Sequence, residues 1–107
     1  MKEIRNQNEL NDAIASSDVV VCKWGAPYCG PCRVLEQTIK SVEESNADTA
    51  EFVEVNVDDA DEDFVDNAGI RNIPVLQYYK NGVVIDKTVG LITEKDLIEK
   101  LNTIKNG

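Results

Sequence analysis

The first periodic pattern along the chain is that of a helix with one apolar face. The apolar stripe consists of Leu10, Ala13 and Ile14, at the three- and four-residue spacing of a helix. Asn6 stands before the stripe, and Glu9 lies three positions after Asn6, an arrangement that caps a helix N-terminus. We therefore expect a helix from Gln7 to Ala15.

The next patterns predict two strands and two helices. The run Val19–Trp24 is short, apolar and β-branched, which is typical of a strand buried on both faces. From Cys29 to Glu44 the spacing becomes helical, and "FVEVNV" (52–57) predicts a second strand. Residues 58–69 are acidic at their start, which suits the positive end of a short helix. The apolar face of the longer helix is expected to comprise Val34, Leu35, Ile39 and Val42.

A hairpin signal follows in the C-terminal third. Two strand patterns, "VLQYYK" (75–80) and "VVIDKTV" (83–89), flank the pair Asn81-Gly82, which favours a two-residue turn. Gly90 ends the second of these strands.

A last helix is predicted after the hairpin, with Thr93 and Asp96 as its capping pair. Its apolar stripe is Leu97, Ile98, Leu101 and Ile104. Helices alternate with strands before the hairpin, so we expect an α/β fold with a mixed sheet covered on both faces. We find no linker or repeat, which favours a single domain over residues 1–107.

Composition narrows the function. The 107 residues are 42% apolar and 29% charged, as in a soluble globular protein. The first dozen residues, "MKEIRNQNELND", are polar throughout, so we expect neither a secretory segment nor a membrane span. The net charge of −9 disfavours nucleic acid and anionic membranes as partners. Three cysteines are too few for a disulfide scaffold, and a reducing cytoplasm is the expected compartment.

Two of the cysteines lie three positions apart at a Gly-Pro corner. On a helix that spacing places two Cβ atoms roughly 5–6 Å apart, near the separation that a disulfide tolerates. At a helix start, unpaired N–H groups and the dipole would lower the pKa of Cys29, and Pro31 suits the first turn. We expect Cys29 to attack a substrate disulfide, and Cys32, deeper in the helix, to resolve the mixed disulfide.

Other roles for these thiols remain open at this point. A zinc site usually needs four ligands, but the chain has no histidine and only Cys22 as a further thiol. A pair of inert buried cysteines is a second alternative, although such cysteines rarely occupy a Gly-Pro corner. Cys22 itself is expected to be a small buried hydrophobe, with a regulatory thiol as the minor alternative.

Four segments resemble the thioredoxin family. They are "APYCGPC" (26–32), "NIPV" (72–75), "YYKNG" (78–82) and "VG" (89–90), which together span most of the chain. The resemblance implies a thioredoxin-like three-layer sandwich, with a central mixed five-stranded sheet and four flanking helices. It also implies a thiol–disulfide oxidoreductase that reduces protein disulfides through its own dithiol, with Gly30 and Pro31 in the active-site motif and without a metal or other cofactor.

The resemblance extends to the substrate site. It implies a cis bond between Ile73 and Pro74, facing the disulfide and leaving the Ile73 backbone free to pair with an extended substrate peptide. Tyr28, Ile73, Pro74, Val89 and Gly90 would then form a shallow apolar groove. For Tyr28 the alternative is an ordinary half-exposed aromatic residue.

The sequence departs from the family at the end of the first buried strand. Tyr28 stands where the family usually has Trp, and Trp24-Gly25 stands where it has two large rings, so one ring beneath the active site is expected to be missing. Lys23 replaces a buried Asp, and Glu54 on the next strand replaces a Lys.

We interpret this exchange as a charge-swapped internal ion pair that handles protons for Cys32. The alternative is that Lys23 extends to solvent from a strand end while Glu54 is a surface residue. An ammonium near Cys32 would stabilise the reduced form and make the dithiol somewhat more oxidising.

The expected electron donor, implied only by the resemblance, is an NADPH-dependent flavoprotein thioredoxin reductase, and the protein is expected to be monomeric. Three other functions are kept as alternatives: a more oxidising oxidase or isomerase, a glutathione-dependent enzyme, and a non-catalytic binding subunit of a larger enzyme. A single Gly90, where a glutathione site usually shows two glycines, weakens the second of these.

Overall fold

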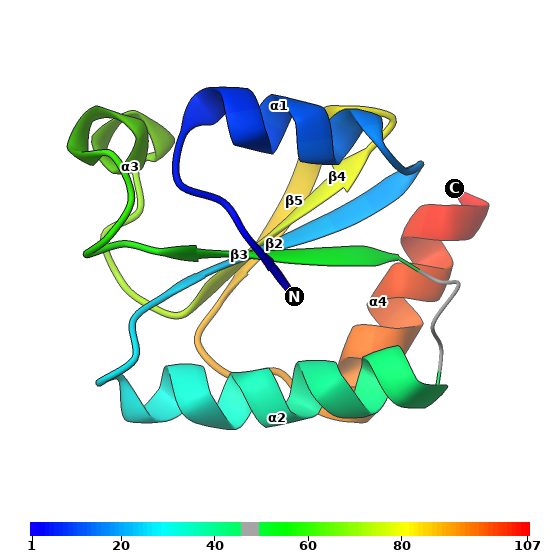
Figure 1. Ribbon diagram of the computed structural model, residues 1–107. Helices are drawn as coiled ribbons and strands as arrows, with labels where there is room; N and C mark the ends of the chain where they lie inside the picture. Colours follow the sequence, from blue (N-terminus) through cyan, green and yellow to red (C-terminus); the bar gives the residue numbers. More distant parts are fainter. Residues whose placement is uncertain (46–49) are drawn as a thin grey trace.

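A five-stranded mixed sheet lies between two layers of helices (Figure 1). The computed structural model describes residues 1–45 and 50–107. In chain order the elements are β1 (Lys2–Glu3), α1 (Gln7–Ala15), β2 (Val19–Gly25), α2 (Gly30–Ser45), β3 (Glu51–Asn56), α3 (Glu62–Ala68), β4 (Val75–Lys80), β5 (Val83–Val89) and α4 (Glu94–Asn106).

The strand order is β1-β3-β2-β4-β5, which places β2 at the centre. Strands β1, β3 and β2 run parallel, whereas β4 is antiparallel to both β2 and β5. Helices α1 and α3 cover one face of the sheet and α2 and α4 the other, as Figure 1 shows. This is the expected three-layer α/β sandwich.

Alternate residues of β2 face two separate cores. The core on the α1 and α3 side receives Val20, Cys22 and Trp24, and the core on the α2 and α4 side receives Val19 and Val21. The Trp24 ring packs against Phe64 of α3 with 5.1 Å between ring centroids, and its Nε1 donates a hydrogen bond to Gln77 Oε1 at 3.0 Å. Trp24 therefore points away from α2 and supplies no ring on the side of the sheet where Gly25 meets Cys32.

The local signals placed the helices and the longer strands to within one or two residues. Asn6 and Thr93 accept the expected capping hydrogen bonds from the backbone N–H groups of Glu9 and Asp96. Asn81 and Gly82 have φ angles of 51° and 82°, the left-handed values that a type I′ hairpin turn requires.

One strand was missed and one expectation was wrong. The sequence pattern did not predict β1 (Lys2–Glu3), which lies beside β3, and the next residue, Ile4, is fully buried. Val34 does not join the apolar face of α2 but is 54% exposed. The buried face of α2 includes Leu35 and Ile39, which are four positions apart. Val34 precedes Leu35 and lies outside this face.

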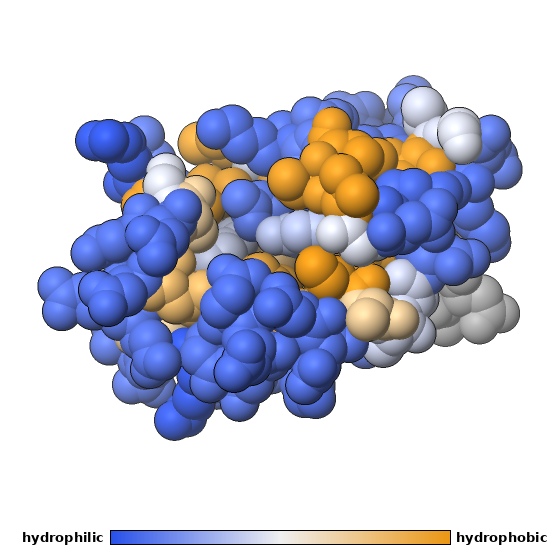
Figure 2. Space-filling view, turned by 90° about the horizontal axis from the view of Figure 1, so that it is seen from above, coloured by the Kyte–Doolittle hydropathy of each residue, from blue (hydrophilic) through white to orange (hydrophobic). Residues whose placement is uncertain are grey.

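Strand β5 forms the open edge of the sheet and carries exposed apolar side chains. They are Val83, Val84, Ile85 and Val89. In the view of Figure 2, hydrophobic atoms form a distinct patch within a largely hydrophilic surface. A register shift at Tyr78/Tyr79 bends the β4–β5 ladder, a device that discourages edge-to-edge pairing. Among the helices of residues 1–45 and 50–107, none has the length and apolar character needed to cross a membrane.

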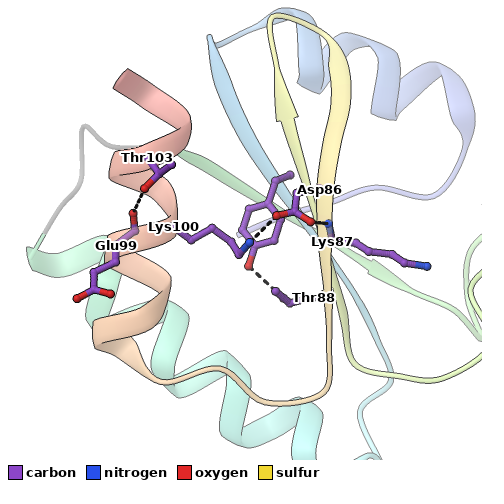
Figure 3. A network of polar contacts seen from close by, with 7 residues as sticks. Asp86, Lys87, Thr88, Glu99, Lys100 and Thr103 are labelled. Atoms are coloured by element: carbon purple, nitrogen blue, oxygen red, sulfur yellow. Dashed lines mark hydrogen bonds and ion pairs between the residues drawn. The ribbon is translucent and has the colours of Figure 1, made fainter. Parts of the chain in front are cut away.

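A polar network fastens the edge strand to α4 (Figure 3). Lys100 Nζ pairs with Asp86 of β5 and lies 5.3 Å from the centre of the Tyr78 ring. The Tyr78 hydroxyl and Thr88 Oγ1 are 3.0 Å apart and share a hydrogen bond. The hydrogen bond from Lys100, together with that from the Lys87 backbone N–H, lowers the pKa of Asp86.

We expect Lys100→Met to lower the free energy of unfolding by about 0.5 to 1 kcal/mol at neutral pH, since the ion pair is partly exposed. Because the pKa of Asp86 is depressed in the folded protein, its share of stability is present above the carboxyl's ordinary pKa and is lost as the pH falls through the folded value. Urea unfolding at pH 7 and pH 3 measures this effect: the difference in free energy of unfolding between the wild-type protein and Lys100→Met should be smaller at pH 3. Lys95→Met on the same helix is the control, and an equal loss there would contradict this role.

Candidate active site

The two thiols are positioned by the turn that joins β2 to α2. The Cys29 N–H donates to the Ala26 carbonyl at 3.2 Å, and the Cys29 carbonyl accepts from the Arg33 N–H at 3.2 Å. Cys29 thus occupies the position before the first helical residue, Gly30, and Pro31 falls in the first turn, where a missing N–H costs no hydrogen bond.

Cys29 and Cys32 form a disulfide, with 5.2 Å between their Cα atoms. The Cys32 backbone N–H also donates to Cys29 Sγ at 3.2 Å, a contact that would stabilise negative charge on this sulfur after reduction. Cys29 is half-buried, whereas Cys32 is only 1% exposed. The expected asymmetry between the two sulfurs is therefore present.

The Ile73–Pro74 peptide bond is cis, which confirms the expectation. The Pro74 carbonyl accepts a hydrogen bond from the Gly90 N–H at 2.8 Å, and Val75 pairs with Val89 across the β4–β5 ladder. Four of the five expected groove residues are thereby brought together: Ile73, Pro74, Val89 and Gly90. The loop before β4 and the end of β5 form one unit.

Tyr28, the fifth expected groove residue, is 75% exposed and comes from the β2–α2 turn. A hydrogen bond to Asp58, and next the charge of that carboxylate, raise the pKa of Tyr28. Asp58 follows β3, and its backbone N–H donates to Asn56 Oδ1 at 3.0 Å. Sequence reasoning did not single out Asp58, since the pattern there indicates only an acidic helix start.

Lys23 and Glu54 do form an ion pair. They are register partners on β2 and β3, and Lys23 Nζ lies 4.0 Å from Glu54 Oε2. The Lys23 side chain is 9% exposed and that of Glu54 is 32% exposed, so only the lysine end of the pair is buried. On the other side of β3, the backbone register partner of Glu54 is Glu3 on β1. The Glu3 carboxylate lies 3.2 Å from Arg5 Nε.

A pocket of about 560 Å³ opens beneath the first turns of α2. Its lining includes Cys32 together with the ion pair, and two charged residues of α2 that sequence reasoning did not assign, Arg33 and Glu36. The remaining lining residues are Glu3, Gly25, Ala26, Pro27, Val55 and Asn56. The buried cysteine is thus adjacent to a polar cavity and not to a closed apolar core.

Cys22 lies away from this pocket, in the opposite core, where burial raises the pKa of its thiol. A buried thiol with a raised pKa is unreactive, in agreement with the expected structural role. Within residues 1–45 and 50–107, no cluster of three or more His, Cys, Asp or Glu side chains could hold a metal ion.

A disulfide between a helix-capping cysteine and a buried cysteine one turn later defines a thiol–disulfide oxidoreductase. Comparisons with known proteins agree. The thioredoxin family model matches residues 2–103. The chain is 35% identical to a thioredoxin from Mycoplasmoides gallisepticum over 94% of its length and 99% of that protein, and 33% identical to one from Porphyra purpurea over 95% and 94%.

Among solved structures, a mutant thioredoxin from Halobacterium salinarum NRC-1 is similar with a TM-score of 0.86 and 27% identity. That similarity covers 96% of this chain and 88% of the other. The chain belongs to the thioredoxin family. It is a protein-disulfide oxidoreductase that works through its own Cys29–Cys32 pair without a further cofactor.

We expect Asp58→Asn to lower the pKa of Tyr28 toward the ordinary value of a phenol. The substitution removes the negative charge that opposes the phenolate, and with it the carboxylate that holds the phenol proton. The measurement is an NMR titration of the assigned Tyr28 ring signals. Asp59→Asn, one residue further from the turn, should leave the titration unchanged. Equal shifts in the two variants would mean that general surface charge, and not this contact, sets the Tyr28 pKa.

Proposed function

We propose that Cys29 is the attacking thiol and Cys32 the resolving thiol in the reduction of protein disulfides. The Cys29 thiolate attacks one sulfur of the substrate disulfide, whose S–S bond breaks, and the departing thiolate takes up a proton. Cys32 then gives up its proton and attacks Cys29 Sγ, which releases the second substrate thiol. Two electrons leave the dithiol, and the Cys29–Cys32 bond forms again.

The observation that carries this assignment is the difference between the two sulfurs. Cys29 is half-buried at the start of α2 and receives the Cys32 N–H, whereas Cys32 is almost fully buried. A protein substrate therefore reaches Cys29 first. The segments Ile73-Pro74 and Val89-Gly90, with Tyr28 on the neighbouring turn, would receive the substrate backbone and its apolar side chains.

The role of the partners is part of the same proposal. An NADPH-dependent flavoprotein reductase would restore the dithiol, and the protein would act as a monomer of one domain, residues 1–107, in the cytoplasm. The support is the family membership, together with a disulfide that must be reduced again after each turnover.

We expect Cys32→Ser to accumulate a mixed disulfide between Cys29 and a test protein such as insulin, because no second thiol resolves it. Cys29→Ser should accumulate far less. Both variants should lose turnover of insulin in the presence of NADPH and a thioredoxin reductase. Mass spectrometry of the trapped adduct reads the roles directly. Trapping on Cys32 would reverse the assignment, and turnover of the double serine variant would overturn it.

Lys23 and Glu54 are proposed to tune the resolving thiol. A buried ammonium beside Cys32 favours the thiolate form of Cys32. The half-exposed Glu54 carboxylate can pass the proton that Cys32 gives up between Lys23, water in the pocket and solvent. This arrangement stabilises the reduced state, so the dithiol would be somewhat less reducing than one without the lysine.

We expect Lys23→Met to shift the dithiol–disulfide equilibrium about tenfold toward the disulfide, or about 30 mV to more negative potential.

Lys23→Asp should cost about 2 to 4 kcal/mol of stability by placing two carboxylates together, and Lys23→Asp with Glu54→Lys should recover most of it. Glutathione equilibration and urea unfolding measure these effects. Glu36→Gln, which removes a charge in the same pocket but outside the ion pair, is the control and should leave both readouts unchanged. A double variant no more stable than the worse single one would contradict the pairing.

A further inference from the structure

Gly25, the last residue of β2, lies where the resolving sulfur and the buried lysine meet. A methyl group added at Gly25 would lie 3.0 Å from Cys32 Sγ, 3.3 Å from Cys32 Cβ and 3.6 Å from Lys23 Cε. The first two separations are shorter than ordinary van der Waals contact between such atoms. The missing side chain therefore leaves the space that Cys32 and Lys23 now share.

The backbone does not require glycine at this position. Positive φ angles among the glycines occur at Gly69, Gly82 and Gly90, and Gly25 is not one of them. A glycine inside a strand also costs stability relative to alanine, because its unfolded chain has more freedom. By contrast, a methyl group at Gly30 would meet no atom within 4 Å. The reason for glycine at position 25 is thus close approach and not backbone geometry.

The same residue borders the pocket beneath α2, whose lining contains the Lys23–Glu54 pair. The ammonium lies 4.0 Å from the Glu54 carboxylate, too far for a good hydrogen bond, and the pocket that both residues line leaves room beside it. A side chain at position 25 would contact Lys23 at an ordinary distance, but it would displace Cys32 and reduce this space.

We propose that Gly25 is a positioning residue for the resolving thiol: by carrying no side chain, it sets the separation between Cys32 Sγ and Lys23. The proposal rests on the tuning role proposed for Lys23 and extends it to a residue that touches neither substrate nor proton. Since the attraction between two charges falls with the distance between them, a displacement of either side chain weakens the support that Lys23 gives to the Cys32 thiolate.

The test is the variant Gly25→Ala. We expect its dithiol–disulfide equilibrium with glutathione to shift toward the disulfide, in the direction of Lys23→Met, by roughly three- to tenfold. In a Cys29→Ser background, the pH midpoint for alkylation of Cys32 by iodoacetamide should rise when alanine is added at position 25. An unchanged equilibrium and an unchanged midpoint would overturn the proposal.

The Lys23→Met background separates this proposal from the one on which it rests. If Gly25 acts through Lys23, adding Gly25→Ala to Lys23→Met should produce no further shift in either readout. A shift of the same size in both backgrounds would show that alanine acts by packing alone and would overturn the proposal. If Lys23→Met itself shifts nothing, the tuning role of Lys23 fails first, and any effect of Gly25→Ala then has another cause.

A measurement on the unchanged protein covers the case in which Gly25→Ala does not fold. The close approach requires nuclear Overhauser contacts between the Lys23 ε-methylene protons and the nearest backbone protons of Gly25, and between Gly25 and the Cys32 β-protons. Both contacts should be present in the oxidised protein and should persist after reduction. The absence of either would overturn the proposal without any variant.

Discussion

The burial of β2 on both faces is the constraint on which the remaining structure depends. The strand is paired with β3 on one side and β4 on the other, and all of its residues are buried. A charged side chain on such a strand is flanked by two other strands, and the residues nearest to it on those strands are its register partners. On β3 that position is Glu54, which makes the ion pair a consequence of strand register as much as of side-chain chemistry.

The same strand brings the redox centre and the core into contact. Lys23 and Gly25 are two residues apart and therefore share the face that α2 covers, while Trp24 points into the opposite core with Phe64. Because only a short turn, residues 26–29, joins β2 to α2, the first turn of α2 lies close to this polar end of the strand. Cys32 is buried for this reason, although what lies beside it is a cavity and not packed hydrocarbon.

Local signals in the sequence were sufficient for most elements. The Asn81-Gly82 turn and the caps at Asn6 and Thr93 depend on residues within four positions, so they can be read directly. Strand β1 could not be read, since two residues carry no period and its pairing with β3 joins segments about fifty positions apart. Val34 was misplaced because apolar character alone does not show which side of a helix meets the sheet.

The active site likewise combines features that the sequence could predict with features that only the fold shows. The cysteine pair, the helix start and the unequal burial of Cys29 and Cys32 follow from a short motif, and the Lys23–Glu54 pair follows from opposite charges on adjacent strands. Asp58 reaches Tyr28 only through the fold. The resemblance to the family leads us to expect a missing ring at Gly25, but only three-dimensional contacts show which atoms lie next to that position.

The crowding at Gly25 also bears on how positions in this chain can change. Positions 23, 25 and 32 contribute to one small volume, so the tolerance of any one of them depends on the residues at the other two. Even a methyl group at position 25 would lie 3.0 Å from Cys32 Sγ, so a larger side chain there requires Cys32 to move. We therefore expect the three positions to be epistatic, so that the effect of a substitution at one of them depends on the residues present at the other two.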